Sequence, residues 1–297
     1  MRARIFLIVQ KVFVESLVAN KTLYYSLTEE RWVWDINNLL GTRITDSAAQ
    51  LLMKAIDTLP DPTRQALRLL SCLGSKADKT TLLMLEDVFA EKNGGVGLSD
   101  ALAVAISKNI LEKNENGYRF SHDLIEQNVY DAMVQSDASD YHMLIGEALV
   151  LKDNTENRTT LRPLSFIAID QINTAMWTRS WDEYSFKFAA LNLKAAEASM
   201  GLSDFDAAFA YVEHGLFCLW NHHWEEETYD LNLGLEQIGS RACFAIADYE
   251  KMEDWVEDVM KHADSLGDRL PTQLLWIEYL GASGKVTEAI DRLVLTT

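Results

Sequence analysis

Residues 118–130 have the sequence YRFSHDLIEQNVY and are predicted to join a short β-hairpin to a helix. The hairpin is indicated by Asn116-Gly117, because this dipeptide favours the positive φ angles of a tight turn between two strands. We expect Ser121 to cap the helix and Asp123 to lie in its first turn, where the helix dipole favours negative charge. His122 is therefore predicted at a strand-to-helix junction, at the positive end of a helix.

The charge of the chain is unevenly distributed. The net charge is −18, and the length of 297 residues with 48% hydrophobic residues is enough for two domains with ordinary cores. Residues 1–120 contain 15 Lys/Arg against 14 Asp/Glu, whereas residues 121–297 contain 12 against 31, a net charge of −19. Phosphate backbones and anionic membranes would repel the second part, so we expect neither nucleic acid nor membrane but protein partners, basic ones among them.

The cysteines favour a reducing compartment. Cys72, Cys218 and Cys243 are far apart, odd in number and surrounded by apolar helical sequence. Such usage is typical of an intracellular protein, and we expect a cytoplasmic location. The apolar run that starts at Ile5 is too short for an export signal or a transmembrane span.

The N-terminal part is predicted to contain a winged helix. A helix is expected over residues 5–19 and an aromatic hairpin over residues 23–35. Four more helices are expected. The first spans residues 46–59, the second is capped by Thr63 and ended by Gly74, and the last two span residues 79–89 and 98–109. The last three helices and the hairpin at Asn116-Gly117 have the order of a winged helix.

Winged helices often bind DNA, so DNA binding is an alternative function of this part of the chain. A DNA-reading helix needs several Lys or Arg residues on one face, and residues 98–109 offer only Lys108. This shortage of positive charge argues against DNA as the partner.

The chain beyond residue 135 is predicted to be a degenerate helical repeat. Three segments share the pattern of an apolar residue that starts a helix, a small or flexible residue three positions later and an apolar residue seven positions later. They are Phe205, Ala208 and Val212; Tyr249, Met252 and Val256; and Val286, Ala289 and Leu293. This pattern matches the second helix of a tetratricopeptide-like hairpin, although the segments lie 44 and 37 residues apart rather than roughly 34.

Motifs for catalysis or metal binding are incomplete. Residues 74–80, GSKADKT, lack the glycine that a P-loop needs directly before its lysine, and Asp78 stands there instead. Cys218, His222 and His223 have a spacing of one helical turn, but a metal site needs three or four ligands, and a core thiol beside exposed imidazoles is the simpler interpretation. The sequence shows no nucleophile elbow, no zinc-protease motif and no paired catalytic carboxylates, so we expect neither enzymatic activity nor a metal.

A set of motifs in a fixed order suggests a family. These motifs are Leu23–Leu27, Arg31–Asp35, Leu59-Pro60, Ala66-Leu67, Cys72–Gly74 and Tyr118–Asp123 with Gln127 and Tyr130. Together they resemble the segment that follows the nucleotide-binding core in STAND-type AAA ATPases, above all the Orc1-like subgroup of large signalling proteins. The resemblance implies residues 1–44 as the end of an ATPase region, 45–134 as a winged helix and 135–297 as tetratricopeptide-like repeats.

The same resemblance implies a role for His122 and Asp123. In STAND proteins a Met-His-Asp motif ends the winged helix, and its histidine approaches the β-phosphate of bound ADP; here Ser121 stands in place of Met. His122 is thus a candidate nucleotide sensor and Asp123 a residue that orients it, or both only complete a helix cap. The P-loop core of the family is expected before residue 5, so the chain itself is predicted to need no cofactor, and ATP or ADP is implied only for the intact protein.

The sequence is compatible with three functions. The chain is a regulatory segment that couples a STAND ATPase to its repeats, a standalone helical-repeat interaction module, or a winged-helix DNA-binding regulator with an acidic tail.

Overall fold

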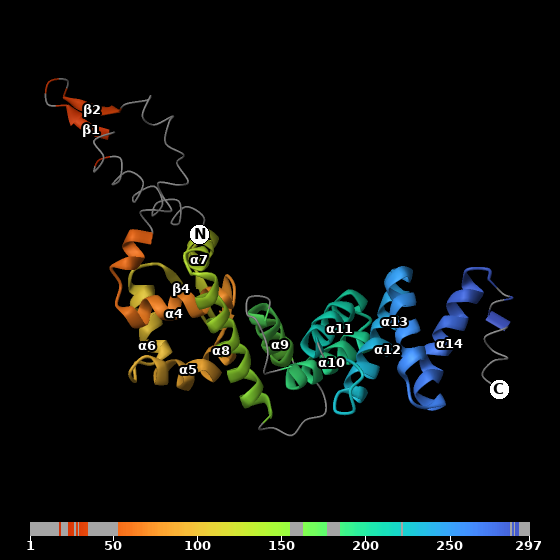
Figure 1. The fold of residues 1–297 in the computed structure, drawn as a ribbon. Helices are drawn as coiled ribbons and strands as arrows, with labels where there is room; N and C mark the ends of the chain where they lie inside the picture. The colour runs from red at the N-terminus through yellow and green to blue at the C-terminus, as the bar shows by residue number, and fades with distance from the viewer. Residues whose placement is uncertain are drawn as a thin grey trace. The chain divides into compact units, whose positions relative to one another are not determined.

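The computed structural model describes residues 18, 23–26, 28, 30–34, 53–154, 163–176, 185–220, 222–285, 287, 289 and 290. The chain divides into two compact units, Met1–Lys152 and Asp153–Thr297. The described residues are mainly helical with small antiparallel β-sheets, which confirms the predicted fold class (Figure 1).

The first described element is the predicted aromatic hairpin. Strands β1 (Leu23–Ser26) and β2 (Arg31–Trp34) pair antiparallel, with Tyr25 opposite Trp32. The rings of Tyr25 and Trp32 meet edge to face, with centroids 5.8 Å apart. The helix predicted over residues 5–19 lies outside the described residues, and of the one predicted over 46–59 the described residues 53–57 are helical.

The next elements have the order of a winged helix. They are α4 (Asp61–Cys72), β3 (Lys76–Asp78), α5 (Lys79–Lys92), α6 (Leu98–Ser107), β4 (Leu111–Asn114), β5 (Gly117–Phe120) and α7 (Asp123–Asp131). The three strands form an antiparallel sheet in the order β3-β5-β4. Leucine, alanine and phenylalanine side chains of α4, α5 and α6 are buried in the core of this unit.

Two details of this unit differ from the sequence prediction. Helix α4 begins at Asp61 after Pro60, so Thr63 lies inside the helix and does not cap it. Pro62 is tolerated in the first turn because the N–H groups of that turn have no intrahelical acceptor. Strand β3 was not expected, because a three-residue strand has little local signal and exists through its pairing with the distant β5.

The turn between β4 and β5 also differs from the prediction. Residues 115–116 form the turn, and Gly117 already pairs with Asn114 in the sheet. The Asn114 side-chain Oδ1 accepts the backbone N–H groups of Asn116 and Gly117, at 2.9 Å each, and these bonds close the turn without a positive φ at Asn116. Gly117 is required for another reason: a Cβ atom there would lie 2.1 Å from the carbonyl oxygen of Ala77 in β3.

The helices that follow are α8 (Gln135–Asn154), α9 (Pro163–Met176), α10 (Ser185–Gly201), α11 (Phe205–Leu219), α12 (Tyr229–Ile246), α13 (Tyr249–His262) and α14 (Leu266–Ala282). Figure 1 shows α10 to α14 succeeding one another side by side. Helices α10 and α11 form one antiparallel pair and α12 and α13 the next, while α12 also contacts α10, α11 and α14. Each pair thus buries one face against the next, as in a stacked array.

The repeat positions predicted from the sequence occupy equivalent places in the two pairs. Phe205 and Tyr249 each start the second helix of a pair, directly after an aspartate whose carboxylate accepts a first-turn N–H group. The side chains three and seven positions later are fully buried in both helices: Ala208, Val212, Met252 and Val256. In the third segment Ala289 is buried, while Val286 and Leu293 lie outside the described residues.

Close packing between helices depends on small and self-complementary residues. A Cβ atom on Gly239 of α12 would lie 2.5 Å from the Trp255 ring of α13, so only glycine lets these helices approach as they do. Between α9 and α10, the buried amides of Asn173 and Asn192 exchange two hydrogen bonds of 2.8 and 2.9 Å. This pair satisfies two polar groups that would otherwise be costly to bury.

The unequal repeat spacing arises in one loop. Helices α11 and α12 are separated by nine residues, 220–228, whereas α13 and α14 are separated by three, 263–265. The helices in the two intervals are otherwise of nearly equal length, with 15 and 18 residues in α11 and α12 and 14 and 17 in α13 and α14. The extra residues are therefore an insertion in the loop that joins the two helix pairs.

We expect Gly117→Ala to lower the free energy of unfolding by about 2–3 kcal/mol, because its methyl group would collide with the Ala77 carbonyl. Gly94→Ala is the matched control: Gly94 also has a positive φ, +63°, but nothing lies within 4 Å of the added Cβ. The control substitution should lower the free energy of unfolding by only about 1 kcal/mol. Urea unfolding followed by circular dichroism measures both, and equal losses would contradict the close approach of β3 and β5.

Candidate functional site

The junction predicted around His122 is a capped helix start. His122 is the residue before α7, and its Nδ1 atom accepts the backbone N–H of Leu124 at 3.0 Å. The prediction that Ser121 caps this helix is wrong. The Ser121 hydroxyl points back to the residues before β4, with its oxygen 2.8 Å from the Asn109 carbonyl and 3.0 Å from that of Ile110. Histidine therefore takes the capping role that serine usually fills.

This cap determines which ring nitrogen of His122 is available. A neutral imidazole that accepts at Nδ1 carries its hydrogen on Nε2. The His122 side chain is exposed, and Nε2 makes no hydrogen bond to the described residues. The ring is thus held in the tautomer that can donate a hydrogen bond to an anion such as a phosphate.

Asp123 does not hold the ring. It lies exposed in the first turn of α7 and makes no hydrogen bond to His122 among the described contacts, so the Leu124 N–H orients the imidazole instead. Burial, with the charges of Asp123 and Asp131 as lesser causes, raises the pKa of Glu126 one turn further along. The role of His122 and Asp123 as nucleotide sensors stays a prediction.

The two weaker motifs do not assemble into sites. The Asp78 carboxylate caps α5 by accepting the N–H of Thr81 at 2.9 Å, so it occupies the helix start where a P-loop would hold phosphate. Cys218 is buried with its sulfur 3.6 Å from that of Met176, and burial raises its thiol pKa to about 12. His222 pairs with Glu225 at 2.9 Å. No group of three or more potential metal ligands exists among the residues that the structure describes.

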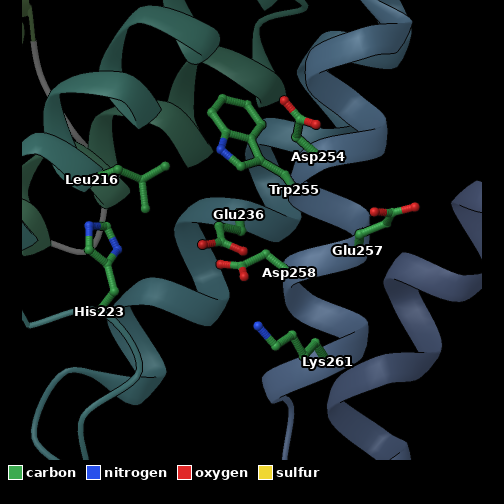
Figure 2. Close-up of a pocket in the computed structure, with 8 residues that line it drawn as sticks. All are labelled: Leu216, His223, Glu236, Asp254, Trp255, Glu257, Asp258 and Lys261. Atoms are coloured by element: carbon green, nitrogen blue, oxygen red, sulfur yellow. The ribbon is translucent and has the colours of Figure 1, made fainter.

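A pocket in the C-terminal unit was not expected from the sequence. It has a volume of about 540 Å³ and lies between the loop before α12 and helices α11, α12 and α13 (Figure 2). One wall is formed by Leu216, His223 and Glu236, and the α13 wall by Asp254, Trp255, Glu257, Asp258 and Lys261. Four of the eight lining residues are acidic.

Glu236 is the buried polar group of this pocket, with 2% of its surface exposed. A chain of hydrogen bonds leads to it: His223 Nδ1 donates to Asn232 Oδ1 at 2.7 Å, and Asn232 Nδ2 donates to Glu236 Oε1 at 2.8 Å. The other oxygen, Oε2, has no donor among the described residues. Figure 2 shows the carboxyl groups of Glu236 and Asp258 pointing toward each other.

Burial raises the pKa of Glu236 to about 9, and the negative charge of Asp258 adds to this rise. Glu236 is therefore protonated at neutral pH and can share its proton with Asp258. The Asp258 carboxylate is in turn positioned by the long loop, because Trp224 Nε1 donates to its Oδ2 at 2.8 Å. His262 Nδ1 lies 3.1 Å from the other oxygen, and its ring stacks on Trp224.

A signal for this pocket was present in the sequence. Asn232, Glu236 and Ser240 are spaced four apart, and all three are buried on one face of α12. Asp258, which faces Glu236, comes from another helix, α13, and only the packing of α12 against α13 brings the two carboxyl groups together.

Comparison with known proteins gives little further guidance. No family model matches the chain, and no solved structure does. The chain is similar to hybrid signal transduction histidine kinase G of Dictyostelium discoideum, with 24% identity over 81 residues, or 27% of this chain. The matched region spans only 2% of that protein's length. Among the described residues, no helix has both the length and the apolar character needed to cross a membrane.

We expect His122→Ala to destabilise the start of α7 by about 1 kcal/mol, because the cap to the Leu124 N–H is lost. His122→Asn is the matched control, since asparagine is a good capping residue and should stay within a few tenths of a kcal/mol of the original. Amide hydrogen exchange at Leu124 and Ile125 measures the effect. Unchanged protection in the alanine variant would show that His122 is not the cap.

We expect Glu236→Gln to become more stable relative to the unchanged chain as pH rises from 5 to 9. The folded-state pKa of Glu236, about 9, lies above its ordinary value of 4.5, so the stability from its neutral form is lost as pH rises through this window. The slope is at most about 1.4 kcal/mol per pH unit. Urea unfolding at pH 5, 7 and 9 measures it, with the exposed Glu226→Gln as control; a difference that stays constant with pH would refute the shift.

Proposed function

We propose that this chain is the regulatory and protein-interaction segment of a STAND-type signalling ATPase, in which the winged helix passes the state of a bound nucleotide to a helical-repeat scaffold. The observation that carries this proposal is the His122 cap. It holds an exposed Nε2–H donor at the end of the winged helix, directly before the helical array. In the resemblance drawn from the sequence, this is the place where a histidine senses ADP.

The charge of the C-terminal part supports proteins as its partners. Residues 121–297 carry a net charge of −19, from 12 Lys/Arg and 31 Asp/Glu, which disfavours nucleic acid and anionic membranes. The similarity to a protein named for signal transduction agrees with this role. In this proposal the chain works in the cytoplasm, without a cofactor or catalytic residues of its own, and the ATPase core belongs to the same intact protein.

The exposed face of α6 supports a protein contact rather than a DNA contact. Its exposed residues are Ser99, Asp100, Ala103 and Ser107, and the basic Lys108 follows only after the helix has ended. A helix that reads DNA needs positive charge along this face. The α6 face instead presents a carboxylate, two hydroxyl groups and a methyl group.

A second candidate function is a helical-repeat interaction module that works without nucleotide. One observation favours it: every residue that lines the pocket belongs to the unit Asp153–Thr297, so the pocket needs nothing from the winged helix. The two functions differ in whether nucleotide affects the protein at all.

We expect the chain alone to hydrolyse no ATP at a measurable rate and to bind no nucleotide at micromolar concentrations in calorimetry. In the intact protein, with the P-loop core expected before residue 5, His122→Asn should weaken ADP binding about 10- to 100-fold, as expected for loss of a hydrogen bond to a charged group. The asparagine keeps the helix cap, so this loss would not come from unfolding. Glu236→Gln is the control and should leave ADP affinity unchanged.

Two results would overturn the proposal in favour of the nucleotide-independent module. One is the absence of an in-frame P-loop in the gene upstream of residue 1. The other is an unchanged ADP affinity in the His122→Asn protein.

A further inference from the structure

The pocket of the C-terminal unit contains two hydrogen-bond acceptors that face each other. Glu236 is 2% exposed, its Oε2 atom has no donor among the described residues, and its carboxyl group points at that of Asp258 (Figure 2). Two carboxyl groups in this arrangement need either a shared proton or a cation between them. The raised pKa of Glu236, about 9, allows the first of these at neutral pH.

The surroundings of this pair favour a cation that comes from outside. Asp254 and Glu257 add two more acidic groups to the lining, and both are exposed. Lys261 also lines the pocket, but no ion pair joins its ammonium group to Glu236 or Asp258 among the described contacts. The pocket therefore holds an excess of negative charge that its own lysine does not neutralise.

The lining of the pocket suits a side chain with an apolar stem and a charged end. Its volume of about 540 Å³ lies in the range of small-ligand pockets, roughly 300–1,000 Å³. Leu216 and Trp255 supply apolar surface, and Glu236 and Asp258 supply acceptors at the centre. A guanidinium group is planar and carries several N–H donors, so it can donate to both carboxylates at once.

We propose that this pocket binds an arginine side chain of a basic partner protein, with the guanidinium group held between Glu236 and Asp258. The proposal rests on the protein-interaction role proposed above and is independent of its nucleotide part. It names the chemistry of the partner: a basic segment with one arginine that enters the pocket.

Binding of this arginine is linked to release of a proton. The neutral Glu236 carboxyl group gives its proton to solvent, and the resulting carboxylate pairs with the guanidinium. The positive charge of the bound proton is thus replaced by that of the guanidinium group. The ionisable groups around Glu236 are His223 from the loop and Asp254, Glu257, Asp258 and Lys261 from α13, with His262 against Asp258. Helix α11 contributes the apolar Leu216 to the lining.

The test uses the full chain and three peptides, acetyl-Gly-Gly-X-Gly-Gly-amide, with X as arginine, citrulline or lysine. Citrulline keeps the shape of arginine without its charge. We expect the arginine peptide to shift the indole N–H signal of Trp224 in NMR spectra, because this group donates to Asp258. Calorimetry in two buffers of different ionisation enthalpy should show release of up to one proton per peptide at pH 7. The citrulline peptide should not bind, and the lysine peptide should bind more weakly than arginine.

Substitutions separate the pocket from the general acidity of the chain. Glu236→Gln should weaken binding of the arginine peptide at least about 10-fold and abolish the proton release, because the variant keeps the shape but cannot ionise. Glu226→Gln makes the same substitution at an exposed loop residue outside the lining and should have no effect. Asp258→Asn, which keeps an acceptor for Trp224, provides a second variant if Glu236→Gln does not fold.

The proposal is refuted if citrulline binds as well as arginine, or if both pocket variants bind like the unchanged chain. An equal loss of binding in Glu226→Gln would also refute it, because that result means diffuse attraction to an acidic surface. A failure here together with a normal effect of His122→Asn on ADP binding would leave the proposed nucleotide coupling intact.

Discussion

Helix α12 packs against α10, α11, α13 and α14, and the C-terminal unit depends on this burial. The close approach to α13 requires Gly239, because any larger side chain would overlap Trp255. The same burial places Glu236 away from water, where a charged carboxylate is costly. The packing that stabilises the array therefore also produces its one strongly perturbed carboxyl group among the described residues.

The N-terminal unit depends on a comparable constraint at strand β5. This strand is the middle of the three-stranded sheet, and its end is joined directly to α7. Ser121 binds back to the carbonyl groups before β4, so the next residue, His122, must satisfy the first N–H groups of the helix. The position and tautomer of the imidazole thus follow from the sheet geometry.

Local patterns in the sequence predicted much of the fold. The spacing of apolar residues predicts the second helix of each pair, because helical periodicity is a short-range property. In both helices an apolar residue, Phe205 or Tyr249, is followed by buried residues three and seven positions later. The sequence did not reveal β3, which depends on pairing with residues about 40 positions away. It also favoured Ser121 over His122 as the cap, since the distant partners of Ser121 could not be known. The pocket was missed for the same reason: Glu236 and Asp258 meet only when α12 and α13 pack together.

The nine-residue loop between α11 and α12 has a consequence for how such an array can acquire specificity. Its residues His223 and Trp224 contact Asn232 and Asp258, so an insertion between two helix pairs supplies one wall of the pocket and positions its acidic centre. The helices themselves keep the regular pattern that stacking requires. A change confined to this loop would therefore alter the lining of the pocket without disturbing the packing between the helix pairs.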